Sequence, residues 1–177
     1  MDITAEELLE LYGLGERDFS GVNISGIILR GVELPRIRLH KANLSGADLI
    51  GSDFSYAGLN ESDLSFAKLR RINLSYAAIL YANLEGADLS YAHLLGTDLS
   101  HSNLWRANFQ IARLNNARLC DTEIGHANFE DTTLIGTNFE GAKINSVIPR
   151  GTLMISPVTY WGTIMPDGSV FKRPYQG

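Results

Sequence analysis

Residues 42–51 read Ala42-Asn43-Leu44-Ser45-Gly46 and then Ala47-Asp48-Leu49-Ile50-Gly51, two units of five residues with one pattern. The pattern extends in both directions, because every fifth residue from Phe19 to Ile144 is Leu, Ile or Phe, which makes 26 units without a change of register. Two positions before the large residue stands Ala, Ser or Thr in 20 of the 21 units between Ala42 and Ala142. The exception is Ile72.

A period of five fits neither the 3.6 residues per turn of an α-helix nor the alternation of a flat strand. The backbone must therefore turn once in every unit. If each unit forms one side of a square, four units close a coil of 20 residues and both the large and the small residue point inward. Coils would stack at the β-strand spacing, so the 26 units predict a filled shaft roughly 31 Å long. The remaining residues of each unit face outward, and the glycines that recur by fives are explained as turns.

These units resemble the A(D/N)LxX unit of the pentapeptide repeat proteins, which are numerous in cyanobacteria; Ala87-Asp88-Leu89-Ser90-Tyr91 is another example. The resemblance covers residues 19–146. It implies an all-β solenoid, a right-handed quadrilateral β-helix. It implies much less about function, because one fold serves many roles.

Both ends of the chain depart from the repeat, and an open β-edge needs a cover. Residues 1–18 contain a capping box, Thr4 with Glu7, followed by an apolar pattern that predicts a short capping α-helix ending near Gly13 or Gly15. Residues 147–177 contain two strand-like runs around Pro166-Asp167-Gly168, which predict a hairpin-like C-terminal cap. This tail could instead bind a partner. Two different caps favour a monomer, with an end-to-end homodimer as the alternative.

Charge and composition exclude several classes of protein. The net charge of −5 lies mostly in residues 1–18, whereas residues 19–146 hold 13 acidic and 11 basic side chains. Such a balance lacks both the basic stripe of a nucleic-acid binder and the dense acidity of a protein that imitates DNA. Cys120 is the one cysteine, and the four histidines do not share a coil and side, so we expect no metal or other cofactor. The start lacks a secretory pattern and no apolar run is long enough to span a membrane, which predicts a cytoplasmic protein without membrane contact.

Outward aromatic residues are the candidates for a protein-binding surface. Residues 20 apart should stack, so Tyr56 and Tyr76 are expected in one column beside Leu95. The candidate residues are Tyr56, Tyr76, Tyr81, Tyr91, Trp105 and Trp161. Arg70 and Arg71 could orient an acidic partner. The alternative interpretation is that these aromatic ladders only stabilise the shaft.

The sequence therefore predicts a non-enzymatic structural or protein-interaction scaffold with an unidentified protein partner. The alternative is a DNA mimic that binds gyrase, as in the quinolone-resistance branch of the family. Catalysis is disfavoured: His101 could approach Cys120 and Asp121, but on a convex wall that cannot hold a substrate. We expect no catalytic residues.

Overall fold

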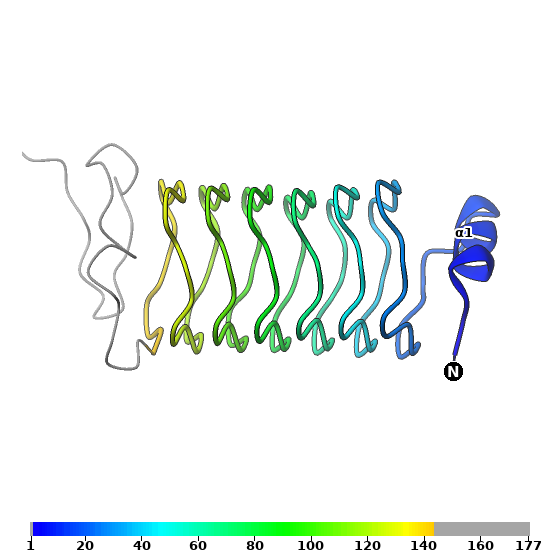
Figure 1. Ribbon diagram of the computed structural model, residues 1–177, viewed down its shortest axis with the longest axis horizontal. Helices are drawn as coiled ribbons and strands as arrows, with labels where there is room; N and C mark the ends of the chain where they lie inside the picture. The colour runs from blue at the N-terminus through cyan, green and yellow to red at the C-terminus, as the bar shows by residue number, and fades with distance from the viewer. Residues whose placement is uncertain (1, 144–177) are drawn as a thin grey trace, which may run out of the picture.

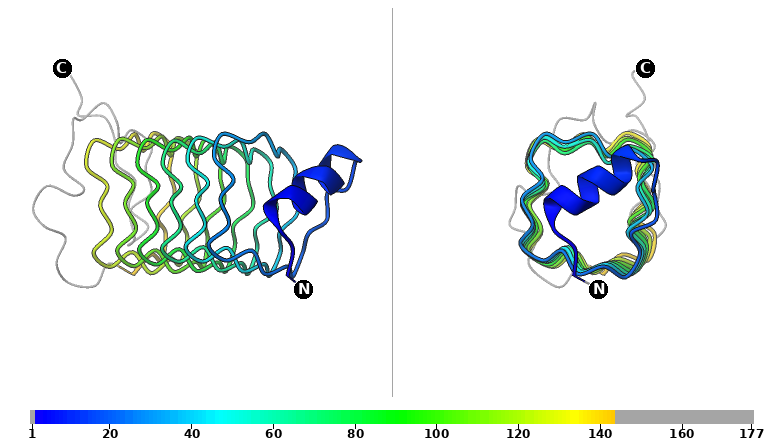
Figure 2. Two further views of the ribbon diagram at one scale, coloured as in Figure 1. Left: turned by 45° about the vertical axis from the view of Figure 1, so that its right-hand side comes forward. Right: turned by 90° about the vertical axis from the view of Figure 1, so that its right-hand side faces the viewer.

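The structure is a computed structural model, and it describes residues 2–143. One nine-residue helix, α1 (Ala5–Gly13), lies at the N-terminal end of a shaft of stacked coils (Figure 1). Parallel bridges join residues 20 apart, from Asn23–Asn43 through Glu123–Lys143, as the square coil requires. Viewed along the axis, the coils superpose as a square (Figure 2). The pairing consists of single-residue bridges instead of continuous strands, because a turn follows each bridge residue at once.

We number the four faces of the shaft by their inward residues in one coil: Leu39 on face 1, Leu44 on face 2, Leu49 on face 3 and Phe54 on face 4. The central residues are almost entirely buried, and the small residues two positions earlier are buried with them from Ala42 onward. Ile72, the one large residue in the small place, is also buried. The core is therefore a continuous column of packed side chains.

Every corner of the shaft has the same backbone geometry. The residue two positions after the central one has positive φ, between 55° and 72°, at all 25 corners from Gly21 to Gly141. The next amide donates back to the central carbonyl, as Ala47 does to Leu44 at 3.0 Å. This is a β-turn whose third residue is left-handed, a position that favours glycine. Sixteen of these corners nevertheless carry a residue other than glycine.

The preferences for Asn or Asp outside and for Ser or Thr inside have local causes. The carboxylate of Asp53 accepts from the Ser55 amide at 2.8 Å, and the amide oxygen of Asn103 accepts from the Trp105 amide at 3.0 Å. These side chains pin the corner that follows. Inside, the Thr97 hydroxyl donates to the Leu74 carbonyl of the preceding coil at 2.7 Å, so the buried hydroxyl is satisfied.

Helix α1 begins with the predicted capping box. Thr4 accepts from the Glu7 amide at 3.2 Å, and the Glu7 carboxylate accepts from the Thr4 amide at 2.8 Å. These contacts lower the pKa of Glu7, chiefly through the Thr4 backbone hydrogen bond. Leu8 is fully buried over the first coil, and the Tyr12 hydroxyl donates to the Pro35 carbonyl at 2.8 Å. The helix lies across the square end of the shaft (Figure 2).

The coil register continues to Lys143. The predicted boundary at residue 146 and the predicted C-terminal hairpin lie outside the described residues. No helix within residues 2–143 is long and apolar enough to cross a membrane.

Candidate protein-binding surface

The corners place large side chains outside the shaft in columns. Tyr56, Tyr76 and Tyr81 are 55%, 51% and 61% exposed, and each occupies a corner position with positive φ. The predicted stacking of Tyr56 on Tyr76 is present, with ring centroids 5.2 Å apart and planes 15° apart. Arg36 lies one coil before this pair, its guanidinium carbon 5.8 Å from the Tyr56 ring centroid.

Two other candidates lie at different corners. Tyr81 stacks on His101 with centroids 4.7 Å apart, on the corner between faces 1 and 2. Trp105 lies across Gly125 and meets His126 edge-on at 4.7 Å, on the corner between faces 2 and 3. The sixth candidate, Trp161, lies outside the described residues.

Tyr91 lies on the corner that precedes face 4. The guanidinium carbons of Arg70 and Arg71 lie 5.2 and 5.7 Å from its ring centroid. These distances are within the range of a cation–π interaction, which places both cations beside the Tyr91 ring. The residue that follows Tyr91 in this column, Ile111, is also exposed.

Face 4 thus collects three of the candidates. Its outward residues are Glu33, Asp53, Asn73, His93, Arg113 and Thr133, joined by parallel bridges in that order. The corner before this face, here the Tyr91 corner, consists of Gly31, Gly51, Arg71, Tyr91, Ile111 and Asp131. The corner after it, the Tyr76 corner, consists of Arg36, Tyr56, Tyr76, Gly96, Asn116 and Gly136.

The sequence analysis missed His93 and Arg113 as members of this surface. Both are exposed and are bridge partners on face 4, next to Tyr91 and Ile111 respectively. Their positions just before a central Leu, 20 residues apart, were a sufficient signal. The aromatic columns lie at the corners, whereas His93 and Arg113 lie on the flat face between two corners.

The least exposed of the ion-paired carboxylates among residues 2–143 is Asp48, on face 3. Asp48 is nearly buried, accepts from Arg30 Nε at 2.8 Å and lies 3.7 Å from Lys68 Nζ. The Arg30 hydrogen bond holds the pKa of Asp48 below its usual range, and burial opposes that shift. Asp48 therefore binds two cations and has a structural role.

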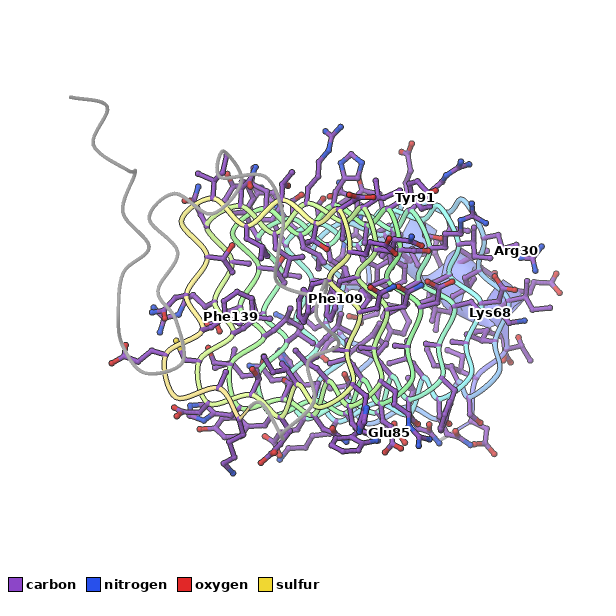
Figure 3. All side chains as sticks on the ribbon, turned by 60° about the vertical axis from the view of Figure 1, so that its left-hand side comes forward. Arg30, Lys68, Glu85, Tyr91, Phe109 and Phe139 are labelled. Carbon is purple, nitrogen blue, oxygen red and sulfur yellow. The ribbon has the colours of Figure 1, made fainter. Side chains whose placement is uncertain are left out.

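Figure 3 shows where these residues lie on the shaft. Arg30 and Lys68 lie near one another toward one end, Tyr91 and Glu85 lie on opposite edges of the view, and Phe109 and Phe139 lie inside.

His101, Cys120 and Asp121 do not form a hydrogen-bonded triad in the structure. His101 Nδ1 is 3.8 Å from the Asp121 carboxylate, and the imidazole stacks on Tyr81. The Cys120 thiol makes no hydrogen bond in residues 2–143. Across the same described residues, no three His, Cys, Asp or Glu side chains gather as metal ligands would.

The comparisons with known proteins agree on the repeat. The family model described as pentapeptide repeats matches in eight copies over residues 18–55, 38–75, 81–110 and 112–148. No curated protein matches. Among solved structures, the chain is similar to HetL of the cyanobacterium Nostoc, described as involved in heterocyst differentiation regulation, at 27% identity over 95% of this chain and 99% of that one, with a TM-score of 0.37.

Two further solved structures bear on the comparison. Rfr23, from the cyanobacterium Cyanothece, is 31% identical over 79% of this chain and 97% of its own, with a TM-score of 0.41. The fluoroquinolone resistance protein QnrB1 is 16% identical over 85% of this chain and 90% of its own, with a TM-score of 0.32. Because these TM-scores are low, the family is assigned from the match to the pentapeptide-repeat family model alone.

Proposed function

We propose that this chain, which belongs to the pentapeptide repeat family and to its right-handed β-helix solenoids, is a non-enzymatic scaffold that presents its outer faces to a protein partner. The observation that carries the proposal is that exposed aromatic residues occupy corner positions. Tyr56, Tyr76, Tyr81 and Tyr91 hold positive-φ positions that glycine would occupy with less strain. Backbone strain kept at exposed aromatic residues favours a surface selected for contact.

The filled interior supports the non-enzymatic part of the proposal. Leu and Phe side chains occupy the axis of the shaft with almost no exposure. Polar side chains project outward on flat faces and convex corners, whereas catalysis needs groups that converge in a cleft. A rigid shaft suits a different task, which is to hold several contact residues at fixed spacing.

The proposal also includes the cytoplasmic location and the monomeric or end-to-end dimeric state expected from the sequence. A single cysteine is compatible with a reducing compartment. Light scattering coupled to size exclusion measures the oligomeric state, and fractionation of the native host measures the location.

Affinity capture from the native host tests the scaffold role. The variant Tyr56→Ser/Tyr76→Ser/Trp105→Ser is expected to lose a protein that the wild type captures, because aromatic anchors dominate most interfaces. Ile28→Ser is the matched control, since Ile28 is an exposed apolar residue at the N-terminal end. Unchanged capture by the folded triple variant would remove the basis of the proposal.

The alternative function, imitation of DNA toward gyrase, is not favoured by the charges on and beside face 4. A DNA mimic needs continuous negative charge, whereas face 4 mixes Glu33 and Asp53 with Arg113 and is bordered by Arg36 and Arg71. We expect no inhibition in a gyrase supercoiling assay at micromolar protein. Inhibition in that assay would replace the scaffold proposal with this one.

A further inference from the structure

We infer that face 4 and the Tyr91 corner bind an acidic, extended segment of a protein partner, with Arg70, Arg71 and Arg113 as its carboxylate-binding groups and Tyr91 as an aromatic platform. This inference rests on the proposed scaffold function and specifies its face and its partner chemistry.

The first observation is the distribution of unpaired arginines. Between Phe19 and Lys143, six of the eleven cationic side chains lie within 4.0 Å of a carboxylate. The five that do not, within that described range, are Arg36, Arg70, Arg71, Arg106 and Arg113. Four of these five border or lie on face 4, and Arg106 is the exception. The unpaired positive charge is thus concentrated on one side of the shaft.

The second observation is a comparison of two equivalent positions. Arg30 pairs with Asp48, the outward residue 18 positions later. The residue with that relation to Arg70 is Asp88, but its carboxylate accepts from the Ser90 amide at 3.0 Å and from Asn108 Nδ2 at 3.1 Å. Arg70 lies near the Tyr91 ring instead. Because the Arg70 guanidinium has no carboxylate within 4.0 Å among the described residues, its N–H groups can bind a planar bidentate acceptor, and a carboxylate is one.

The third observation is the strain at the Tyr91 corner. Gly31 and Gly51 occupy its first two positions, but Arg71, Tyr91 and Ile111 follow with φ of 59°, 61° and 59°. Each would be less strained as glycine, and Ile111 is β-branched and so especially unfavourable there. At this corner the first residue larger than glycine is Arg71, and Arg70 and Arg71 are the first unpaired arginines beside it.

The spacing sets the shape of the ligand. Arg71 and Arg113 lie two coils apart along the axis, about 9.6 Å at the β-strand spacing. An extended segment rises about 3.3 Å per residue and its side chains alternate sides, so carboxylates two or four residues apart face the shaft together at about 6.6 or about 13.2 Å, and flexible arginine side chains can reach either spacing. Tyr91 lies one coil from each of them, Ile111 lies beside Arg113, and both side chains offer apolar contact. Asp131 and Glu130 follow one coil later and limit the site, which favours a short acidic segment over a long polyanion.

The test uses the full chain and a fluorescein-labelled peptide, Glu-Glu-Phe-Leu-Glu-Glu, with Gln-Gln-Phe-Leu-Gln-Gln as the neutral probe. Fluorescence anisotropy is expected to show saturable binding of the acidic peptide that weakens as NaCl rises. Arg71→Gly and Arg113→Gln should each weaken it about two- to fivefold, the range for exposed ion pairs. Arg106→Gln is the matched control and should leave affinity unchanged.

Several results would overturn the inference: equal affinity for the neutral peptide, an equal effect of Arg106→Gln, or no binding at all. Displacement of the peptide by an equimolar DNA oligonucleotide at physiological salt would assign the face to nucleic acid instead. Arg71→Gly should also keep or raise the unfolding midpoint, so weaker binding by this variant does not reflect unfolding. If the peptide fails to bind but the triple aromatic variant still loses its captured protein, the scaffold function stands and only the acidic-segment inference fails.

Discussion

Single residues at the corners of this shaft are subject to two opposing demands. The backbone requires positive φ, which favours glycine, while sixteen corners carry a side chain. Gly46 and Ile111 represent the two solutions: nothing lies within 4 Å of a Cβ atom added to Gly46, so a substitution there adds only backbone strain. Substitutions at such corners can therefore measure the effect of backbone strain apart from that of packing.

We expect Gly46→Ala to lower the free energy of unfolding by about 1 kcal/mol, because alanine is strained at positive φ. Ile111→Gly should be neutral or raise it by up to about 1 kcal/mol, since relief of strain exceeds the entropy cost of glycine. Urea unfolding followed by circular dichroism measures both. Gly13→Ala is the control, because Gly13 is helical and alanine there should stabilise α1. A destabilised Ile111→Gly variant would show that packing dominates at this corner.

Asp48 gives the shaft a specific dependence on pH. Its pKa is lowered in the folded chain, mainly by the Arg30 hydrogen bond, so its contribution is present above the unfolded pKa of about 3.9 and is lost as pH falls through the folded value. Wild type should be more stable than Asp48→Asn at pH 6, and their unfolding free energies should converge toward pH 3. A difference between them that stays constant with pH would show that the charge of Asp48 is not what stabilises the fold.

At the scale of the element, α1 is held by few contacts. Some of its side chains face the shaft and others face the solvent, and Leu8 is its one buried residue. The capping box starts the helix, but an isolated nine-residue helix is unstable in water, so the first coil must supply the rest. The helix and the first coil accordingly depend on one another: Val22 and Ile37 are buried beneath it, in the positions that hold Ala, Ser or Thr farther along.

Replacement of Leu8 by Ala should cost about 2–5 kcal/mol of local stability and release α1 from the shaft. Hydrogen exchange of the α1 amides should accelerate strongly in this variant, while the central coils remain protected. Leu9→Ala, on the same helix but 39% exposed in the wild type, is the matched control and should change little. Equal exchange in the two variants would mean that α1 is held by other contacts, such as the Tyr12 hydroxyl on Pro35.

At the scale of the whole molecule, the shaft behaves as a stack in which each coil contacts only its neighbours. Every bridge joins residues 20 apart or, at the N-terminal segment, 21 apart for Asp2 and Asn23. Stability should therefore depend on register more than on the number of coils.

Deletion of residues 117–136 removes one complete coil and should leave a folded protein, shorter by about 4.8 Å, with a modestly lower melting temperature. Deletion of residues 117–135 removes one residue fewer and turns the following inward side chains out of register. This second variant should lose protection from hydrogen exchange beyond the junction. Small-angle scattering and hydrogen exchange measure both outcomes, and a well-folded 117–135 deletion would contradict the importance of register.

The positions of many of the site residues could be predicted from the sequence, because the repeat assigns each residue to a face or corner. The stacking of Tyr56 on Tyr76 and the proximity of His101 to Asp121 follow from residues 20 apart lying in one column. The binding role of Tyr56, Tyr76, Tyr81, Tyr91 and Trp105 remains a prediction. The direction of a side chain was harder to predict, because it depends on neighbours in adjacent columns. Trp105, which lies across Gly125, is an example.

The sequence by itself predicted the coil of 20 residues, its filled core, its corners and its N-terminal helix, because a period of five requires a turn in every unit if each large residue is to point inward. Only the tertiary structure decided which charges pair. Arg30 reaches Asp48, while Arg70 turns to Tyr91 and leaves Asp88 to Ser90 and Asn108. The repeat fixes where each backbone lies, but long side chains choose among several neighbours within reach. That choice leaves the positive charge of face 4 unpaired.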